Sequence, residues 1–199
     1  MSRTAIRGAM DRDIEAEGAI EIGIDVARFG DDKTDIYKRH GLKTIEHKEF
    51  AGQDTMRTAL VAWDMADRNP EIPIKVDDTG VGGAVTDRLK ELGANVVPVN
   101  FGGNPHDTDK YTSAADEMWF TFPIDEADIP NDPVLMQELS GRQADYDTKG
   151  RRKIEPKKEF KKRIGRSPDR ADALLLAYYP ANAYNVLMTS GWGASDLGL

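Results

Sequence analysis

The chain has 199 residues, enough for one domain with a substantial core. It is 39% hydrophobic and 31% charged, which is typical of a globular protein rather than a disordered or fibrous one. No apolar run reaches the roughly 18 residues that span a bilayer and the N-terminus is polar, so we expect neither a membrane partner nor a secretory signal. The absence of cysteine excludes disulfides, thiolate zinc sites and cysteine nucleophiles; with only three histidines, a bound metal is expected to have oxygen ligands.

The first part of the chain predicts an antiparallel meander. Alternating, β-branched residues occur in three short segments separated by polar or glycine turns, the pattern of consecutive strands joined by hairpins. These expected strands lie at 20–27, 33–39 and 43–50. Two further strands are expected at 72–76 and 95–99, and a helical pattern separates them.

Helical periodicity dominates most of the remaining segments. Apolar residues recur at helical spacing after Asp54, a predicted N-cap. The last helix is expected to be N-capped by Ser167, with Pro168 at its first position. The segment 144–160 predicts a hairpin with Lys149 at its tip. The expected helices are 54–69, 84–92, 112–122, 133–143 and 168–179.

This order of elements predicts an α/β fold. A meander followed by strands that alternate with helices gives a mixed sheet of five or more strands, antiparallel first and then parallel, flanked by helices. The order resembles the ribonuclease H-like fold. We expect this domain at 19–180, preceded by a linker or leader at 1–18 and followed by a loosely held tail at 181–199. Trp119, at helical spacing with other apolar residues, is expected in the core.

The charge of the chain is unevenly distributed. The net charge is −8, but the 18 residues from Lys149 to Arg166 contain ten basic and two acidic side chains. That segment therefore carries +8 and the rest of the chain −16. A charge run of this kind is often only a solvated surface. It is also the pattern of a surface that binds the phosphates of a nucleic acid.

Acidic residues occur at three places where a carboxylate is either costly or well placed for chemistry. Asp25 lies within an apolar strand, and Asp77-Asp78 ends a strand before a glycine turn. Asp172 lies near the start of the otherwise apolar last helix. Each has a structural alternative: a pair with an arginine, a bond to the turn backbone, or an interaction with the helix dipole, which also applies to Asp169. If the three places converge, their mutual repulsion favours a bound divalent cation.

Three motifs follow one another along the chain: GIDVARFGDDKT at 23–34, VDDTGVG at 76–82 and GRSPDRADAL at 165–174. In this order and spacing they resemble the nuclease domain of the large terminase subunit of tailed bacteriophages, over about residues 19–180. The resemblance implies a metal-dependent endonuclease that cuts double-stranded viral DNA during genome packaging. It also implies hydrolysis of the phosphodiester bond with two Mg²⁺ or Mn²⁺ ions.

The resemblance implies roles for individual residues as well. The implied catalytic and metal-binding acids are Asp25, Asp77 and Asp172, with Asp32 as a further metal ligand. We expect Asp25 to lie between the two ions. Asp78 remains an alternative to Asp77, because strand alternation does not separate the two, and Asp31 is the alternative to Asp32.

An acidic metal pocket repels DNA, so nearby basic side chains are needed to hold the phosphates. The expected DNA-binding residues are Lys153, Lys157, Lys158, Lys161, Lys162, Arg163 and Arg166.

Whole large terminases also contain an ATPase motor, but no G-x-x-x-x-G-K-[ST] motif occurs here, so we expect an isolated nuclease domain. In the full motor its partners would be an ATPase domain, the portal and the small terminase subunit, in the host cytoplasm and transiently at the procapsid portal.

Two other functions remain open from the sequence. The same fold could serve a Holliday-junction resolvase or another ribonuclease H-like nuclease. Alternatively, the domain could grip DNA or dock on the portal without catalysis, its acids being structural. A third class, the sugar kinases and actin-like ATPases, begins with a similar strand but needs a second such half, for which the chain is too short.

Overall fold

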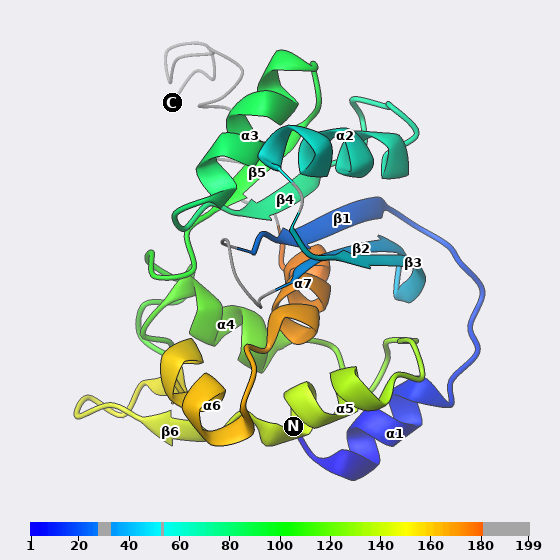
Figure 1. The fold of residues 1–199 in the computed structure, drawn as a ribbon. Coiled ribbons are helices and arrows are strands. Elements are labelled where there is room, and N and C mark those ends of the chain that lie inside the picture. Colours follow the sequence, from blue (N-terminus) through cyan, green and yellow to red (C-terminus); the bar gives the residue numbers. More distant parts are fainter. Residues whose placement is uncertain (28–32, 53, 181–199) are drawn as a thin grey trace, which may run out of the picture.

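The computed structural model describes residues 1–27, 33–52 and 54–180. Five strands form one mixed sheet (Figure 1). In spatial order they are β3 (Lys43–Phe50), β2 (Thr34–His40), β1 (Ile20–Asp25), β4 (Ile74–Asp77) and β5 (Val96–Val99). β1, β2 and β3 are antiparallel neighbours, whereas β4 is parallel to β1 and β5 is parallel to β4. The expected meander followed by parallel strands is therefore confirmed.

Helices cover both faces of this sheet (Figure 1). α2 (Thr55–Met65) and α3 (Gly82–Glu91) pack on one face, and α7 (Asp169–Tyr178) crosses the other. α4 (Ala114–Thr121) and α5 (Pro133–Gly141) pack against α7 on the side away from the sheet. Asp54 caps α2 as expected, because its side chain accepts a hydrogen bond from the backbone of Arg57. None of the described helices is long and apolar enough to cross a bilayer.

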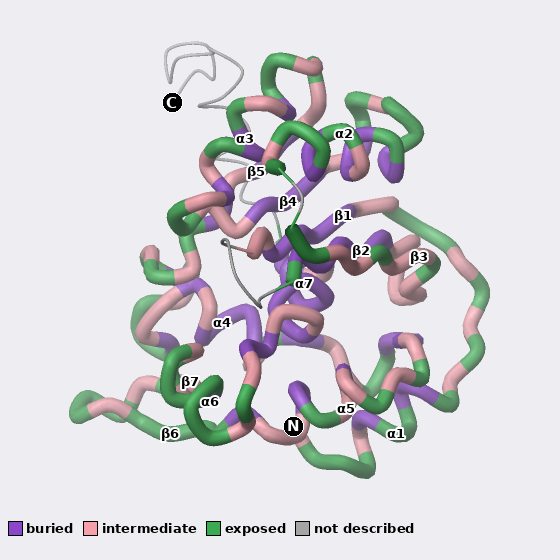
Figure 2. Tube along the Cα trace, viewed as in Figure 1, coloured by how far each residue is buried: buried purple, intermediate pink, exposed green. Residues whose placement is uncertain are grey.

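Strands β1 and β4 direct their isoleucine and valine side chains into the hydrophobic core on one face of the sheet, and glycine or charged residues towards the other face. Ile22 and Ile24 face the core under α2 and α3, so the intervening Gly23 and the following Asp25 face α7. Gly23 allows α7 to lie directly on the sheet, because a Cβ atom at this position would come within 2.9 Å of Ala177 Cα and overlap nearby helix backbone. Figure 2 shows α7 as the most continuously buried helix.

The C-terminal end of α7 is held by two cations from the sheet. Lys75, on β4, is fully buried and donates to the carbonyl oxygens of Ala177, at 3.0 Å, and Tyr179. Arg39, on β2, donates from Nε to the same Ala177 oxygen at 2.7 Å. Both cations pair with Glu21 on β1. These bonds satisfy carbonyl groups that a helix end leaves free, and they fix the position of α7 along the sheet.

Two expectations from the sequence need correction. The segment 1–18 contains a helix, α1 (Arg3–Met10), whose Ile6 is fully buried in the core beside α5, so this part of the chain is not simply a linker. The expected hairpin at 144–160 is shorter, with strands β6 (Ala144–Tyr146) and β7 (Arg152–Ile154), and α6 (Lys157–Ile164) follows it. The expected tail at 181–199 and the candidate Asp32 lie outside the described residues.

Candidate active site

Two neighbouring parallel strands end in an aspartate at the same edge of the sheet. The pairing of Ile24 with Val76 places Asp25 of β1 beside Asp77 of β4. Both side chains point to the α7 side and line one cavity of about 280 Å³. The adjoining turn into α3 is tight because Gly82 has no Cβ, which would otherwise overlap the Asp77 carbonyl oxygen. Strand ends of this kind are where open α/β sheets bind ligands.

The first turn of α7 brings two further aspartates to the same place. Asp169 and Asp172 are three positions apart and therefore share one face of the helix. The ammonium group of Lys157, at the start of α6, joins them to the sheet. Its Nζ lies 2.7 Å from Asp25 Oδ2, 3.1 Å from Asp169 Oδ1 and 3.5 Å from Asp172 Oδ2. Two of the three places predicted from the sequence, the end of β1 and the start of α7, thus meet around one positive charge, and Asp77 lines the same cavity.

Burial and mutual repulsion shape the electrostatics of this cluster. Burial raises the pKa of Asp25 well above its ordinary value, and the surrounding carboxylates act in the same direction against the pull of Lys157. Burial likewise raises the pKa of Asp77. Although burial disfavours the charged form of Lys157, the facing carboxylates raise its pKa well above the ordinary value. The cluster contains more carboxylates than one ammonium neutralises, and such an excess favours binding of a further cation or a proton.

Asp172 is held by two donors on a single oxygen. Its Oδ1 accepts from Trp119 Nε1 at 2.9 Å and from Arg142 at 2.8 Å. Its Oδ2 is buried and has no hydrogen-bond partner among the described residues, although the Lys157 ammonium lies nearby. Buried polar atoms normally have partners, so a free carboxylate oxygen in this position fits a site for a cation.

The structure also separates Asp77 from Asp78. Asp78 accepts a hydrogen bond from the hydroxyl of Thr86 on α3 at 2.9 Å, and it lies outside the cavity that Asp25 and Asp77 share. Asp77 accepts from the backbone of Thr79 at 3.1 Å. The geometry therefore places Asp77, rather than Asp78, among the clustered carboxylates.

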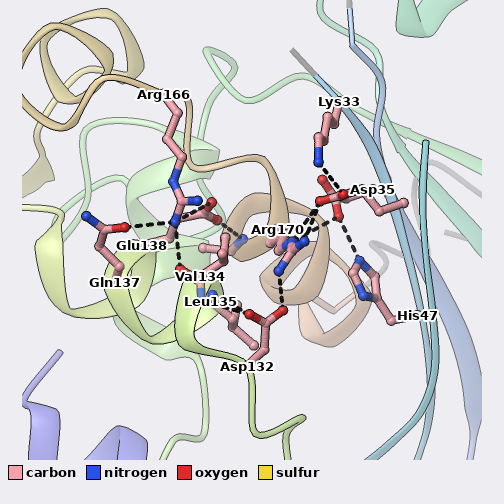
Figure 3. Close-up of polar contacts among 12 residues, drawn as sticks. Lys33, Asp35, His47, Asp132, Val134, Leu135, Gln137, Glu138, Arg166 and Arg170 are labelled. Atoms are coloured by element: carbon pink, nitrogen blue, oxygen red, sulfur yellow. Dashed lines mark hydrogen bonds and ion pairs between the residues drawn. The ribbon is translucent and has the colours of Figure 1, made fainter. Parts of the chain in front are cut away.

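The N-terminus of α7 is capped from another helix. The cap residue is Pro168, which provides no side-chain cap, so the helix begins one residue later than expected. Instead, Glu138 of α5 accepts from the backbone N–H of Ala171 at 2.9 Å. The neighbouring Arg170 pairs with Glu49 at 2.7 Å. Arg170 also pairs with Asp132 (Figure 3). These contacts fix the turn that carries Asp169 and Asp172.

Burial gives the carboxyl group of Glu138 an unusually high pKa. Glu138 is 2% exposed, and its burial raises the pKa to about 8. The hydrogen bond from Ala171 and the charge of Arg166, at 3.6 Å, oppose this shift without cancelling it. Glu138 therefore titrates in a range where most carboxyl groups are already ionised.

The basic segment lies beside the cluster but is distributed over three elements. Lys153 is on β7, most of the others are on α6, and Arg166 follows α6. Lys157 differs from the rest because its ammonium lies within the acidic cluster. Several of the others pair with local acids or amides, including Lys162 with Glu159 at 2.8 Å and Arg166 with Gln137 at 3.0 Å. The exposed residues of the expected DNA-binding set are Lys158, Lys161, Lys162 and Arg163.

The carboxylate oxygens of the cluster suit a hard divalent cation, although the Lys157 ammonium lies among them. Within 1–27, 33–52 and 54–180, no three acidic or histidine side chains form a ready-made metal site. The acids nevertheless offer only oxygen ligands, and Asp172 Oδ2 is an unsatisfied acceptor. Asp25, Asp77, Asp169 and Asp172 are therefore the described residues that could hold such an ion, with the Lys157 ammonium moving aside.

The solved structures that match this fold include nuclease domains of phage large terminase subunits. The nuclease domain of the large terminase subunit of bacterial virus Sf6 matches with a TM-score of 0.70 and 17% identity, covering 90% of this chain and 98% of that one. The large terminase nuclease of thermophilic phage G20c with bound magnesium matches with a TM-score of 0.61 and 14% identity, covering 87% and 95%. No protein-family model and no curated protein matches the sequence. At these identities the likeness establishes the ribonuclease H-like fold of the chain.

Sequence reasoning missed three residues of this site. Lys157 was expected to bind DNA, and Trp119 was expected to be an ordinary core residue; Arg142 was not considered. Asp169, which the sequence allowed as a support for the metal site or as a helix cap, shares one helix face with Asp172 because three positions separate the two. Nothing in the sequence near Trp119 or Arg142 indicates their contact with Asp172.

Proposed function

We propose that this chain is the nuclease domain of a phage large terminase subunit, a metal-dependent endonuclease that cuts double-stranded viral DNA during genome packaging. The observation that carries the proposal is the convergence of Asp25, Asp169 and Asp172 on the Lys157 ammonium, with Asp77 on the wall of the same cavity. The fold shared with the terminase nuclease domains of Sf6 and G20c supports it. Those nucleases have been solved with manganese, magnesium or cobalt.

In this proposal the carboxylates hold the ions and the surrounding residues hold the carboxylates. Asp25, Asp77 and Asp172 are the metal ligands and catalytic acids, and Asp169 lies close enough to assist them. Bound Mg²⁺ or Mn²⁺ would supply an activated water and neutralise charge on the phosphate and its leaving oxygen. Asp25, at the end of β1, the central strand of the sheet, would contribute to holding both ions. Asp32 remains a proposed further ligand.

In this proposal Lys157 neutralises the carboxylates in the absence of an ion and contacts DNA in its presence. Its ammonium neutralises part of the carboxylate charge and so keeps the cluster compact when no ion is bound. A bound ion would repel the ammonium group, and the flexible lysine stem would then turn towards solvent. The side chain is 36% exposed, which leaves it a route outward. The freed ammonium would then lie where it can contact a DNA phosphate.

The basic segment from β7 through α6 to Arg166 would hold the DNA backbone next to the cluster. The residues proposed for this contact are Lys153, Lys158, Lys161, Lys162, Arg163 and Arg166, together with the displaced Lys157. Phosphate contacts carry no base information, so cleavage should show little sequence preference. In the complete motor the domain would work with an ATPase domain, the portal and the small terminase subunit, in the host cytoplasm and transiently at the procapsid.

The experiment that tests the proposal is a substrate panel with and without metal. The purified chain is incubated with supercoiled plasmid, linear duplex, a four-way junction and an RNA–DNA hybrid, in Mg²⁺, Mn²⁺ or EDTA. We expect nicking and linearisation of duplex DNA with either metal and none in EDTA. Cleavage confined to the junction would indicate a resolvase. DNA binding without cleavage of any substrate would indicate a gripping module.

A further inference from the structure

Trp119 and Arg142 make an asymmetric contact with Asp172. Two donors from separate elements, the α4 indole and the guanidinium that follows α5, both bind Oδ1, at 2.9 Å and 2.8 Å. The other oxygen, Oδ2, has no hydrogen-bond partner among the described residues and lies 3.5 Å from the Lys157 ammonium. The carboxylate therefore has one fully bound oxygen and one free oxygen, and the free one is directed into the acidic cluster.

The two donors also fix each other. The Arg142 guanidinium carbon lies 4.8 Å from the centre of the Trp119 ring, a cation–π contact between two buried side chains. Arg142 Nε donates to the carbonyl oxygen of Glu155 at 2.9 Å, which holds the guanidinium at a second point. Neither donor can rotate without losing a buried contact. Asp172 is consequently held in one rotamer by a preorganised pair.

This arrangement is costly for a residue with only a structural role. An indole N–H needs a single acceptor, and one donor on each oxygen would satisfy the buried carboxylate better than two donors on one. Concentrating both donors on Oδ1 leaves Oδ2 as a desolvated acceptor whose neighbouring cation, the Lys157 ammonium, lies 3.5 Å away, and this costs stability unless a cation binds Oδ2 more closely. The asymmetry is useful if Oδ2 has to be presented to an ion in a fixed direction.

We propose that Trp119 and Arg142 are positioning residues that present Oδ2 of Asp172, as a single-oxygen ligand, to the divalent cation. The inference rests on the nuclease function proposed above, and it identifies which carboxylate oxygen binds the ion and what orients it. Residues that orient metal ligands commonly change affinity by about 10- to 100-fold when they are removed. Trp119→Phe removes the N–H donor while keeping most of the aromatic volume.

The inference predicts a specific response of the indole groups. The chain has three tryptophans, so its two-dimensional ¹H–¹⁵N NMR spectrum should contain three indole resonances. The variants Trp119→Phe and Trp63→Phe assign two of them. Titration with Mg²⁺ should shift the Trp119 indole resonance, because its acceptor carboxylate binds the ion. The Trp63 resonance should not move, because Trp63 lies in the core on the opposite face of the sheet.

Calorimetric titration with Mn²⁺ provides the second test. Trp119→Phe should bind Mn²⁺ about 10- to 100-fold more weakly than the wild type. The matched control, Trp63→Phe, removes a similarly buried indole and should bind as the wild type does. The positioning role would be overturned if both variants bound Mn²⁺ with equal affinity. It would also be overturned if the Trp119 indole resonance stayed fixed while wild-type protein bound Mg²⁺. Either result would leave the proposed nuclease function untouched. If wild-type protein binds no Mn²⁺ at all, the proposed nuclease function itself is contradicted.

Discussion

The ammonium of Lys157 donates to Asp25 Oδ2 at 2.7 Å, although 132 positions separate the two residues along the chain. Asp169 and Asp172 of α7 approach the same ammonium, so one positive charge joins the sheet to the helix that covers it. A lysine in this position shows that the cluster stabilises a cation. It also identifies the charge that a divalent ion would have to displace.

Replacing Asp25 by Asn should abolish DNA cleavage and preserve the fold. Asparagine has the same shape but lacks the charge that binds a divalent cation, and its neighbours Asp169 and Asp172 remain to pair with Lys157. We expect plasmid nicking in Mn²⁺ to fall to background while the circular dichroism spectrum and Tm stay close to those of the wild type. Wild-type nicking by a folded Asp25→Asn variant would rule out this assignment.

The aspartate doublet offers an internal comparison. Asp77→Asn removes a carboxylate from the cavity shared with Asp25, whereas Asp78→Asn alters a side chain that binds Thr86 on α3. Nicking should be lost in the first variant and largely retained in the second, measured at equal protein concentration and equal Mn²⁺. The reverse pattern, with Asp78 essential and Asp77 dispensable, would mean that the strand end presents the other carboxylate to the metal.

Replacing Lys157 by Met should make the stability of the protein depend on metal. Without the ammonium, the carboxylates of Asp25, Asp169 and Asp172 repel one another, so we expect Tm at neutral pH to fall by on the order of 5 °C. Mn²⁺ should restore it, and should raise Tm more in this variant than in the wild type because no ammonium has to be displaced.

The control for this experiment is Lys158→Met, which removes an exposed lysine from the same helix. It should leave both the Tm and its response to Mn²⁺ unchanged. A Lys157→Met variant whose Tm does not respond to millimolar Mn²⁺ would show that the carboxylates bind no ion.

Glu138 should make the protein less stable as pH rises. Its pKa is raised by burial from an ordinary value of 4.5 to about 8, so between these values the folded chain retains a proton that the unfolded chain has released. The free energy of unfolding therefore falls through this window, by on the order of a few kcal/mol in all. Glu138→Gln has no such proton to lose. The Tm of the variant minus the Tm of the wild type should therefore increase from pH 5 to pH 8.

The exposed Glu126→Gln variant is the matched control and should follow the wild type at every pH. A difference between Glu138→Gln and the wild type that is constant across the range would mean that Glu138 does not titrate there. Thermal melts in buffers of equal ionic strength provide the measurement.

Reversing charge on the exposed face of α6 should weaken DNA binding. Lys158→Glu combined with Lys161→Glu replaces two positive charges with two negative ones beside the cluster. We expect DNA affinity to fall by about tenfold or more and the salt dependence to become less steep, because fewer counterions are released. Fluorescence anisotropy with a duplex at several salt concentrations measures both quantities.

Lys90→Glu on α3 serves as the control, since that helix covers the opposite face of the sheet. If it lowers affinity as much as the α6 variant does, binding depends on overall charge rather than on this face.

The sheet and most helices could be predicted because their residues follow regular patterns. The alternation of Ile22 and Ile24 defines β1, and the apolar run after Asp172 defines α7. Helix α6 escaped prediction because Phe160 is its only buried residue, so its sequence has too few apolar positions to reveal a helical spacing. Helix α1 is short and contains Gly8, a poor helix former, which obscured the spacing of its buried residues.

The site was predictable only in part. Asp25 could be selected because it is a charge within an apolar strand, and the pair Asp77-Asp78 because it follows one, but only the structure places Asp77 rather than Asp78 in the cavity. The contact between Trp119 and Asp172 spans 53 positions and depends on how α4 packs against α7. No local pattern encodes such packing, so the residues that orient the carboxylates emerge only from the three-dimensional structure.

The central claim is that Asp25, Asp77 and Asp172 bind divalent ions. The most direct test is a crystal of this chain soaked in Mn²⁺ and measured for anomalous scattering at the manganese edge. The account predicts at least one strong peak in contact with Asp25 and Asp172, with the Lys157 ammonium displaced from its present position. A fully soaked crystal with Lys157 unmoved and no peak among these aspartates would contradict it.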